Sequence, residues 1–182
     1  MQYIKGMQFY QNDKKTAITL GKFDGLHIGH ETLIERVIAH QKNDGVDSVV
    51  FAFDMAPLYE KLKKKKESLI TNEERAGRLL GRVDYLVECP FVEAVSKIEA
   101  ETFIKEILVK QFHAEYIVVG TDFHFGYQKK GDYHMLQQYS GEYGYEVEVI
   151  EKKCYEDREI SSTYIKEEVK KGNMKLVDRK SV

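Results

Sequence analysis

A ten-residue segment that begins at Gly21 carries the side chains best suited to chemistry. Its glycines, Gly21, Gly25 and Gly29, allow tight turns and a close approach of the backbone to a ligand. His27 and His30 stand where a helix is expected to begin, and the free N–H groups and dipole of a helix N-terminus favour phosphate. Imidazole groups can also donate hydrogen bonds to phosphate oxygens. The segment lacks the Lys-Ser/Thr ending of a P-loop and the glycine spacing of a dinucleotide fold, so it predicts a phosphate site of another kind.

A second anion site is indicated near the carboxyl end of the sequence. Ser161, Ser162 and Thr163 are three consecutive hydroxyl residues, and Lys166 follows them where a last helix should begin. An N-cap role explains one hydroxyl without any ligand. Three hydroxyls and a cation favour a phosphate-binding role.

A third segment, residues 120–126, follows an expected strand. Asp122 is placed to hold a ribose hydroxyl or to order a neighbouring group, and Phe123 and Phe125 could form a wall against a planar ring. The alternative is a turn whose two phenylalanines pack into the core.

The elements that must position these segments alternate between strands and helices. Short β-prone runs predict strands at 16–21, 47–53, 83–88, 115–120 and 145–150. Apolar residues at helical spacing, and a capping box formed by Thr71 and Glu74, predict helices at 31–41, 71–80, 100–111, 132–143 and 163–172.

This alternation predicts an α/β, Rossmann-like fold with about five parallel strands and helices on both faces. Ligands of such sheets gather at the carboxyl ends of the strands. The unusual segments 21–30, 53–57 and 120–126 each follow a strand, so we expect one shared site there. The lysine-rich run 61–66 is either a solvated loop or a flap that meets an anionic substrate.

The composition is that of an ordinary globular protein. The chain has 182 residues, of which 42% are hydrophobic and 32% charged, and a formal net charge of −2 that gives no reason to expect nucleic acid as a partner. Cys89 and Cys154 lack metal-ligand spacing and fit a reducing compartment. No apolar run suits a signal peptide or a membrane span, so we expect one cytoplasmic domain over 1–182 without a membrane partner.

The motifs resemble those of one known family, the FAD synthetase (FMN adenylyltransferase) domain of the bacterial bifunctional riboflavin kinase/FAD synthetases. Residues 21–30 are similar to its Gly-x-Phe-Asp-Gly-x-His-x-Gly-His, and residues 120–126 to its Gly-x-Asp-Phe-x-Phe-Gly. Residues 160–166 resemble Ile-Ser-Ser-Thr-x-Ile-Arg, and Leu69-Ile70-Thr71 with Glu74 resembles its motif before the second helix. The resemblance spans about 16–172.

The resemblance implies a transferase in which the FMN phosphate attacks the α-phosphorus of ATP, giving FAD and pyrophosphate. It implies that His27 and His30 are catalytic, and that Mg²⁺ bridges the phosphates without a dedicated carboxylate cluster. The residues it assigns to ATP and its phosphates are Gly21, Phe23, Asp24, Gly25, Gly29, Ser161, Ser162, Thr163 and Lys166. Those it assigns to nucleotide or flavin are Phe53, Asp54, Pro57, Gly120, Asp122, Phe123 and Phe125.

Three departures from the family pattern matter. Where the family has a Pro-His-Pro-like turn after the second strand, residues 53–57 keep only Pro57. Lys166 stands in place of arginine, which keeps the charge but loses the bidentate fork. The riboflavin kinase domain is absent from the sequence, which belongs either to a natural single-activity enzyme or to a bifunctional one cut at the domain boundary. In the first case we expect a separate riboflavin kinase to supply FMN.

Two alternatives stay open. A related nucleotidyltransferase could use another acceptor, such as nicotinamide mononucleotide or phosphopantetheine; residues 120–126 favour flavin, and the altered turn weighs the other way. A non-catalytic flavin- or nucleotide-binding module is the alternative of another class. His27 and His30 weigh against this alternative, because binding alone would not need them.

Overall fold

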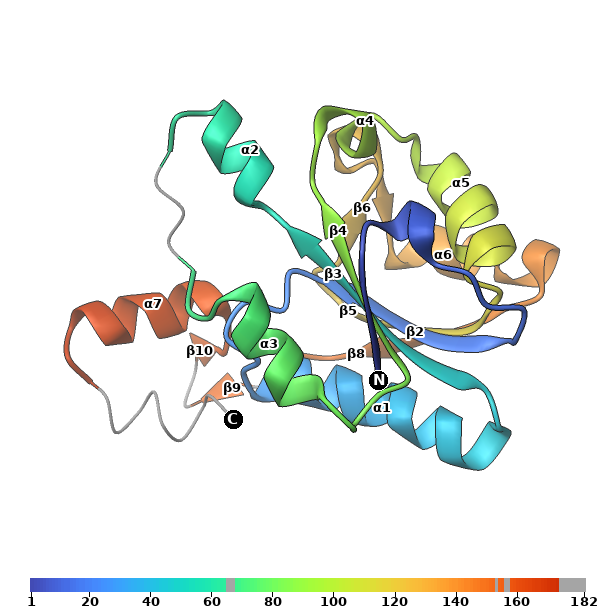
Figure 1. The fold of residues 1–182 in the computed structure, drawn as a ribbon, viewed down its shortest axis with the longest axis horizontal. Helices are drawn as coiled ribbons and strands as arrows, with labels where there is room; N and C mark the ends of the chain where they lie inside the picture. The colour runs from blue at the N-terminus through green and yellow to red at the C-terminus, as the bar shows by residue number, and fades with distance from the viewer. Residues whose placement is uncertain (65–67, 153, 156–157, 174–182) are drawn as a thin grey trace.

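The computed structural model describes residues 1–64, 68–152, 154–155 and 158–173, and its centre is a six-stranded parallel sheet (Figure 1). The strand order is β1-β4-β3-β2-β5-β8. The strands are β1 (Gln2–Lys5), β2 (Thr16–Gly21), β3 (Asp47–Asp54), β4 (Tyr85–Pro90), β5 (Ala114–Gly120) and β8 (Glu146–Ile150). The expected α/β fold with about five parallel strands is therefore confirmed, and the sheet has one strand more than the five located in the sequence. Strand β1 escaped prediction because only Ile4 of its four residues is buried, which leaves no periodic pattern.

The helices lie close to their predicted positions. They are α1 (Ile28–Asp44), α2 (Ala56–Lys61), α3 (Asn72–Leu79), α4 (Glu93–Ser96), α5 (Ala100–Thr102), α6 (Tyr133–Tyr143) and α7 (Ser162–Lys170). Helices α2 and α4 were not predicted. The helix predicted over 100–111 starts as α5 and continues as a π-helix, η2 (Phe103–Gln111), for which the sequence offers no explanation.

Short elements complete the chain between and after the main strands. They are the 3-10 turns η1 (Met7–Phe9) and η3 (Tyr127–Lys129) and two antiparallel pairs, β6 (His124–Phe125) with β7 (Gly131–Asp132) and β9 (Cys154–Tyr155) with β10 (Arg158–Glu159).

Two helix boundaries follow from local signals in the sequence. The Thr71 hydroxyl accepts from the Glu74 N–H at 3.1 Å, and the Glu74 carboxylate accepts from the Thr71 N–H at 2.7 Å, so the predicted capping box starts α3. Gly45 ends α1 with a left-handed φ of 72°, a conformation that costs glycine nothing.

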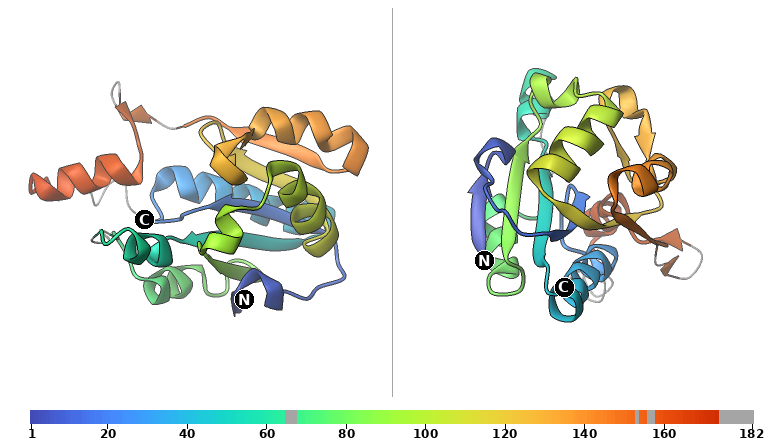
Figure 2. Two further views of the ribbon diagram at one scale, coloured as in Figure 1. Left: turned by 90° about the horizontal axis from the view of Figure 1, so that it is seen from above. Right: turned by 90° about the vertical axis from the view of Figure 1, so that its right-hand side faces the viewer.

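Helices cover both faces of the sheet, as Figure 2 shows from two directions. On one face, Ile34 and Val37 of α1 and Leu79 of α3 pack against β2, β3, β4 and β5. On the other face, η2 and α6 enclose a larger core that includes Phe51 and Phe112, both fully buried. Helix α7 lies beyond the carboxyl edge of the sheet rather than on either face (Figure 2).

Successive strands are added to the sheet in two opposite directions from its middle. From β2 the chain runs outward through β3 to β4, and from β5 it runs the other way to β8. The order therefore reverses between β2 and β5, where the helices leave from opposite faces and a crevice opens at the carboxyl ends. Segments 21–30 and 120–126 both begin at this point.

Two further observations bear on sequence expectations. No helix in the described part of the chain is long and apolar enough to cross a membrane. In the lysine-rich run, Lys61 forms an exposed ion pair with Glu93 at 2.7 Å, while residues 65–67 lie outside the described residues, so the choice between loop and flap remains a prediction.

Gly126 gives a test of how tightly the segment after β5 is packed. A Cβ at this position would lie 2.6 Å from the Ala100 Cα, and its φ is +73°. We expect Gly126→Ala to lower the free energy of unfolding by about 2 kcal/mol or more, because both the overlap and the left-handed backbone oppose it. Urea unfolding measures this change.

The matched control is Gly141→Ala in α6, where an added Cβ meets nothing within 4 Å. That variant should gain about 0.5–1 kcal/mol from the better helix propensity of alanine. Equal stabilities for the two variants would contradict the packing described here.

Candidate active site

A cleft of about 630 Å³ opens at the reversal point of the sheet. Its walls come from the carboxyl ends of β2, β3, β5 and β8 and from the start of α7. Eleven residues predicted for the site line it: Gly21, His27, Gly29, His30, Phe53, Gly120, Asp122, Phe123, Phe125, Ser161 and Ser162. The structure thus brings the three sequence motifs together in one cavity.

The turn after β2, residues 21–27, has an unusual backbone conformation. Phe23 and Leu26 have φ values of 47° and 36°, in the left-handed region that non-glycine residues rarely adopt. Both side chains are completely buried in the core beneath α1 and α3. Burial of two large apolar side chains offsets the backbone cost of about 1–2 kcal/mol for each residue. Phe23 therefore shapes the turn from below and does not line the cleft.

Two glycines of this turn are required by close neighbours. Gly25 has a φ of +91°, and a Cβ there would lie 2.6 Å from the Leu69 Cδ1. A Cβ on Gly29 would lie 3.2 Å from the His27 ring. Gly25 thus lets the turn contact the segment before α3, whereas Gly29 leaves room for the imidazole. Gly25 does this from outside the cleft lining.

His27 and His30 form a stacked pair at the N-terminus of α1. Their ring centroids are 3.7 Å apart with an interplanar angle of 20°. The Nδ1 atom of each ring is shielded from solvent and has no hydrogen-bond partner among the described residues. Buried polar atoms are seldom left without a partner, and two adjacent ones on rings that line the cleft favour a ligand-binding role for the pair.

Both imidazoles are held neutral in this structure. Burial lowers the pKa of His27 to about 4, although the carboxylates of Asp122 and Asp24 partly oppose the shift. Burial also places the pKa of His30 well below its usual value, and His27 and Arg75 add to that effect. Near pH 7 each ring can donate one hydrogen bond, and an anionic ligand would raise both pKa values.

Asp24 joins three segments of the chain outside the cleft lining. Its carboxylate accepts from the Leu69 N–H at 2.7 Å, the Ser68 hydroxyl at 3.1 Å and the Lys166 ammonium at 2.6 Å. Its backbone carbonyl accepts from the Ser162 hydroxyl at 2.6 Å. Burial acts to raise the pKa of Asp24, but Lys166 and the Leu69 N–H outweigh it and hold the pKa below its usual value. We call these four contacts the Asp24 junction.

The residues of the hydroxyl motif, 161–166, do not all reach the cleft. The Ser161 hydroxyl accepts from the Tyr164 N–H at 3.2 Å and so caps α7, while Ser162 donates to Asp24. Both serines line the cleft, but Thr163 is exposed and Lys166 is occupied by Asp24. Of the four residues predicted to bind phosphate here, only the two serines therefore reach the cavity.

The segment after β5 supplies one charged and two aromatic groups. Phe123 and Phe125 are stacked with centroids 5.6 Å apart; Phe123 is half-buried and Phe125 is 4% exposed. Asp122 is exposed and forms an ion pair with Lys152 at 3.1 Å. The two phenylalanines line the cleft and also pack in or against the core, so the core packing is confirmed and a contact with a planar ring stays a prediction.

The residues after β3, where the family pattern has a turn, lead directly into helix α2. The Asp54 carboxylate accepts from the Ala56 N–H at 3.0 Å and Pro57 stands in the first turn of α2, so both residues build the helix rather than line the cleft. Helix α2 contains no buried residue of its own. With Phe53 it adds an apolar wall that the sequence did not reveal, lined by Met55, Leu58, Tyr59, Phe91, Val95, Ile98 and Phe103.

A buried ion pair between Arg75 and Glu88 lies against the turn after β2. The Arg75 guanidinium contacts the Glu88 carboxylate at 3.0 Å and the Lys22 carbonyl oxygen at 3.4 Å, and Tyr3 donates to Glu88 at 2.7 Å. Arg75 and Glu88 are 4% and 5% exposed. Sequence reasoning missed this pair, since no local signal links α3 to β4. It also missed the cleft-lining Lys22 and Lys152.

A double-mutant cycle tests the Asp24 junction. We expect Asp24→Asn and Lys166→Met each to lower the free energy of unfolding by about 1–3 kcal/mol, because each leaves a partly buried charge unpaired. The double variant should lose about 1 kcal/mol less than the sum of the two. The control cycle is Lys61→Met with Glu93→Gln, an exposed pair expected to couple by less than about 0.5 kcal/mol. Equal coupling in both cycles would refute the junction.

The histidine pair predicts a pH dependence of stability. His27 has a folded pKa of about 4 against 6.5 for the free side chain, so the unfolded state binds more protons between these values. Stability contributed by the neutral ring is complete above pH 6.5 and falls as the pH drops toward 4. Without ligand, the parent should lose ~2 kcal/mol more than His27→Gln between pH 7.5 and 5, as measured by urea unfolding. Parallel losses in the two proteins would show that His27 is not held neutral.

Comparisons with known proteins agree with the fold and with the family resemblance. The bifunctional riboflavin kinase/FMN adenylyltransferase of Escherichia coli K12 is 29% identical over 164 residues, which cover 89% of this chain and 52% of that protein. That of Buchnera aphidicola subsp. Schizaphis graminum is 28% identical over 170 residues, covering 91% of this chain and 54% of the relative. The chain thus spans about half the length of the curated relatives it matches.

Two solved structures share the fold. A macrolide-efflux protein from Streptococcus pneumoniae superposes with a TM-score of 0.85 at 24% identity, over 99% of this chain and 61% of the other. Pantoate-beta-alanine ligase from Francisella tularensis gives 0.56 at 12% identity, over 90% of this chain and 72% of the ligase. The family profile of FAD synthetase matches residues 9–164, a range that contains both histidines, the Asp24 junction except Lys166, and the apolar wall. The chain belongs to the FAD synthetase family.

Proposed function

We propose that this chain transfers the adenylyl group of ATP to FMN, giving FAD and pyrophosphate. The observation that carries the proposal is the convergence, in one cleft of a FAD synthetase family member, of a histidine pair with unpartnered nitrogens and a wall of aromatic side chains. The first feature suits a polyphosphate and the second suits a planar ring.

The ATP phosphates would lie against the N-terminus of α1. His27 and His30 would donate hydrogen bonds to the phosphate that is transferred, and Ser161 and Ser162 would contact the departing pyrophosphate. Phe23, Asp24 and Gly25 would act indirectly, because they hold the turn in shape without lining the cleft. Lys166 would act indirectly through Asp24 as well.

The flavin ring would lie between the apolar wall and the segment after β5. Phe53 and Phe123 are both partly exposed and both line the cleft, so they offer faces for stacking. Gly120 leaves room for the Asp122 carboxylate at the end of β5, because a Cβ on Gly120 would lie 3.1 Å from it. Asp122 would contact a sugar hydroxyl.

The reaction needs positioning more than covalent chemistry. A phosphate oxygen of FMN would form a bond to the α-phosphorus of ATP while the bond from that phosphorus to the bridging oxygen breaks, and pyrophosphate would leave with the electron pair. Negative charge grows on the oxygens around the α-phosphorus during this exchange. Neutral imidazoles that already face the site stabilise that charge without reorganisation.

Mg²⁺ belongs to the proposal as a companion of ATP. Across the described residues, no group of three His, Cys, Asp or Glu side chains could hold a metal ion. The protein ligands therefore do not fit a resident metal cage, and we propose that Mg²⁺ would be bound by substrate phosphates and water. No step described above depends on it.

The FMN substrate would come from a riboflavin kinase. In the curated relatives, riboflavin kinase and FMN adenylyltransferase belong to one protein, which does not support the expectation of a separate kinase. We propose only that a riboflavin kinase activity supplies FMN, on this polypeptide or another. Substrates of this kind would place the reaction in the cytoplasm.

The decisive measurement is flavin fluorescence of the purified protein with FMN, ATP and Mg²⁺. Adenine stacks on the ring in FAD, so fluorescence should fall while pyrophosphate appears in equal amount. His30→Ala should lower the rate by about 100-fold or more while ATP still binds, because the interaction acts on the developing charge. His134→Ala, an exposed histidine on α6, serves as control and should keep the parent rate.

Unchanged fluorescence in the parent, with ATP bound, would refute the proposed acceptor. The same assay with nicotinamide mononucleotide or phosphopantetheine would then test the other acceptors. Loss of ATP binding in His30→Ala, together with no turnover in the parent, would favour a binding module instead.

A further inference from the structure

The charges that line the cleft do not match the anion it is proposed to bind. ATP brings about four negative charges, whereas the two histidines are neutral near pH 7 in the free protein. The charged side chains of the lining are Lys22, Asp122, Lys129, Glu151 and Lys152. Which of these lysines is available to a phosphate depends on what each already contacts.

Two of the candidate cations already have carboxylate partners. Lys166 contacts Asp24 at 2.6 Å and lies outside the cleft lining. Lys152 lies between Asp122 at 3.1 Å and Glu159 at 2.7 Å. A phosphate that approached either ammonium would lie beside a carboxylate that already neutralises it, and repulsion between the two anions reduces the gain.

Lys129 has a different position. It belongs to η3, which is attached to the apolar wall through the hydrogen bond from the Tyr127 N–H to the Ile98 carbonyl oxygen at 2.7 Å. It therefore lies on the side of the cleft that suits a ring, away from the N-terminus of α1.

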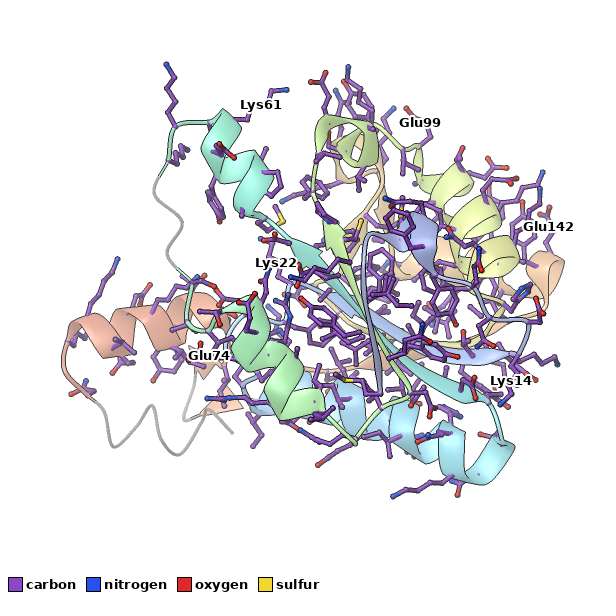
Figure 3. All side chains as sticks on the ribbon, viewed as in Figure 1. Lys14, Lys22, Lys61, Glu74, Glu99 and Glu142 are labelled. Atoms are coloured by element: carbon purple, nitrogen blue, oxygen red, sulfur yellow. The ribbon has the colours of Figure 1, made fainter. Side chains whose placement is uncertain are left out.

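Lys22 combines a fixed backbone with a free side chain. It follows Gly21 at the carboxyl end of β2, and its carbonyl oxygen accepts from the buried Arg75. Its side chain is exposed and lines the cleft, with no carboxylate partner in the described ranges. Figure 3 shows Lys22 at the end of the central strands, in the space between α2 and α3.

We propose that Lys22 is the phosphate-contacting cation of this cleft, and that Lys166 is a positioning residue which holds α7 against the turn. The proposal rests on the proposed function only in that ATP is the ligand. Lys22 occupies one of the three variable positions of the Gly-x-Phe-Asp-Gly-x-His-x-Gly-His motif, so the motif itself gave no reason to select it.

The positions of the two lysines explain the division of roles. The ammonium of Lys22 is solvated and can meet an incoming phosphate without breaking an ion pair. Its backbone lies between Gly21 and the buried Phe23, and its carbonyl oxygen accepts a hydrogen bond from Arg75. Only the flexible side chain must therefore be ordered on binding. Lys166, by contrast, loses its partner if it moves toward the cleft.

The test is the dissociation constant of ATP, measured by titration calorimetry on the full chain with Lys22→Gln, Lys166→Arg and a control, Lys105→Gln. Lys105 is an exposed residue of η2 that does not line the cleft. Lys22→Gln should bind ATP about tenfold more weakly, lose part of the salt dependence of binding and keep the parent melting temperature. Lys105→Gln and Lys166→Arg should bind ATP within about twofold of the parent.

Three results would overturn the proposal. One is unchanged ATP binding in Lys22→Gln. Another is ATP binding about tenfold tighter in Lys166→Arg at the parent melting temperature, because the bidentate fork of arginine would strengthen a phosphate contact at residue 166. The third is a parent protein that does not bind ATP at all. If the parent binds ATP but forms no FAD, the proposed adenylyl transfer fails alone, and the binding comparison still decides the role of Lys22.

Discussion

The carboxylate of Asp24 is the contact on which the rest of the site depends. The turn after β2, the segment before α3 and helix α7 are distant in sequence, and all three meet at this side chain through hydrogen bonds of 2.6–3.1 Å. Apolar contacts of Ile160 and Ile165 with Ile28 and Leu69 cover the same junction. Because α7 lies beyond the sheet, these contacts fix the two serines relative to the two histidines.

The architecture could be predicted to a large extent, for identifiable reasons. The central strands are buried runs, the capping box at Thr71 satisfies both of its hydrogen bonds, and Gly45 ends α1 in the left-handed conformation. Strand β1 and helix α2 escaped because an edge strand with one buried residue and a six-residue helix with none carry no periodic signal. Local patterns reveal an element only when it has a distinct buried face.

The site was predictable in location but not in the division of labour among its residues. The strand ends indicated that segments 21–30 and 120–126 would meet, and the structure places residues of both in one cleft together with Ser161 and Ser162. Motifs cannot tell whether a side chain contacts the ligand or another residue, because that depends on distant partners. Lys166 pairs with Asp24 across 142 positions, and Arg75 reaches both Glu88 and the carbonyl of Lys22. Phe23 is completely buried beneath the turn and does not line the cavity.

Helix α2 has a consequence for the energetics of ligand recognition. The helix buries none of its six residues, and besides the exposed ion pair of Lys61 with Glu93 its apolar contacts come from side chains that border the cleft, such as Leu58 and Tyr59. A ring bound there would cover the same apolar surface that anchors the helix. Affinity for the ring and local order of α2 are then two expressions of one set of contacts. A protease that cuts between β3 and α3 would therefore discriminate the empty protein from the loaded one, even though its cleavage sites lie outside the reacting groups.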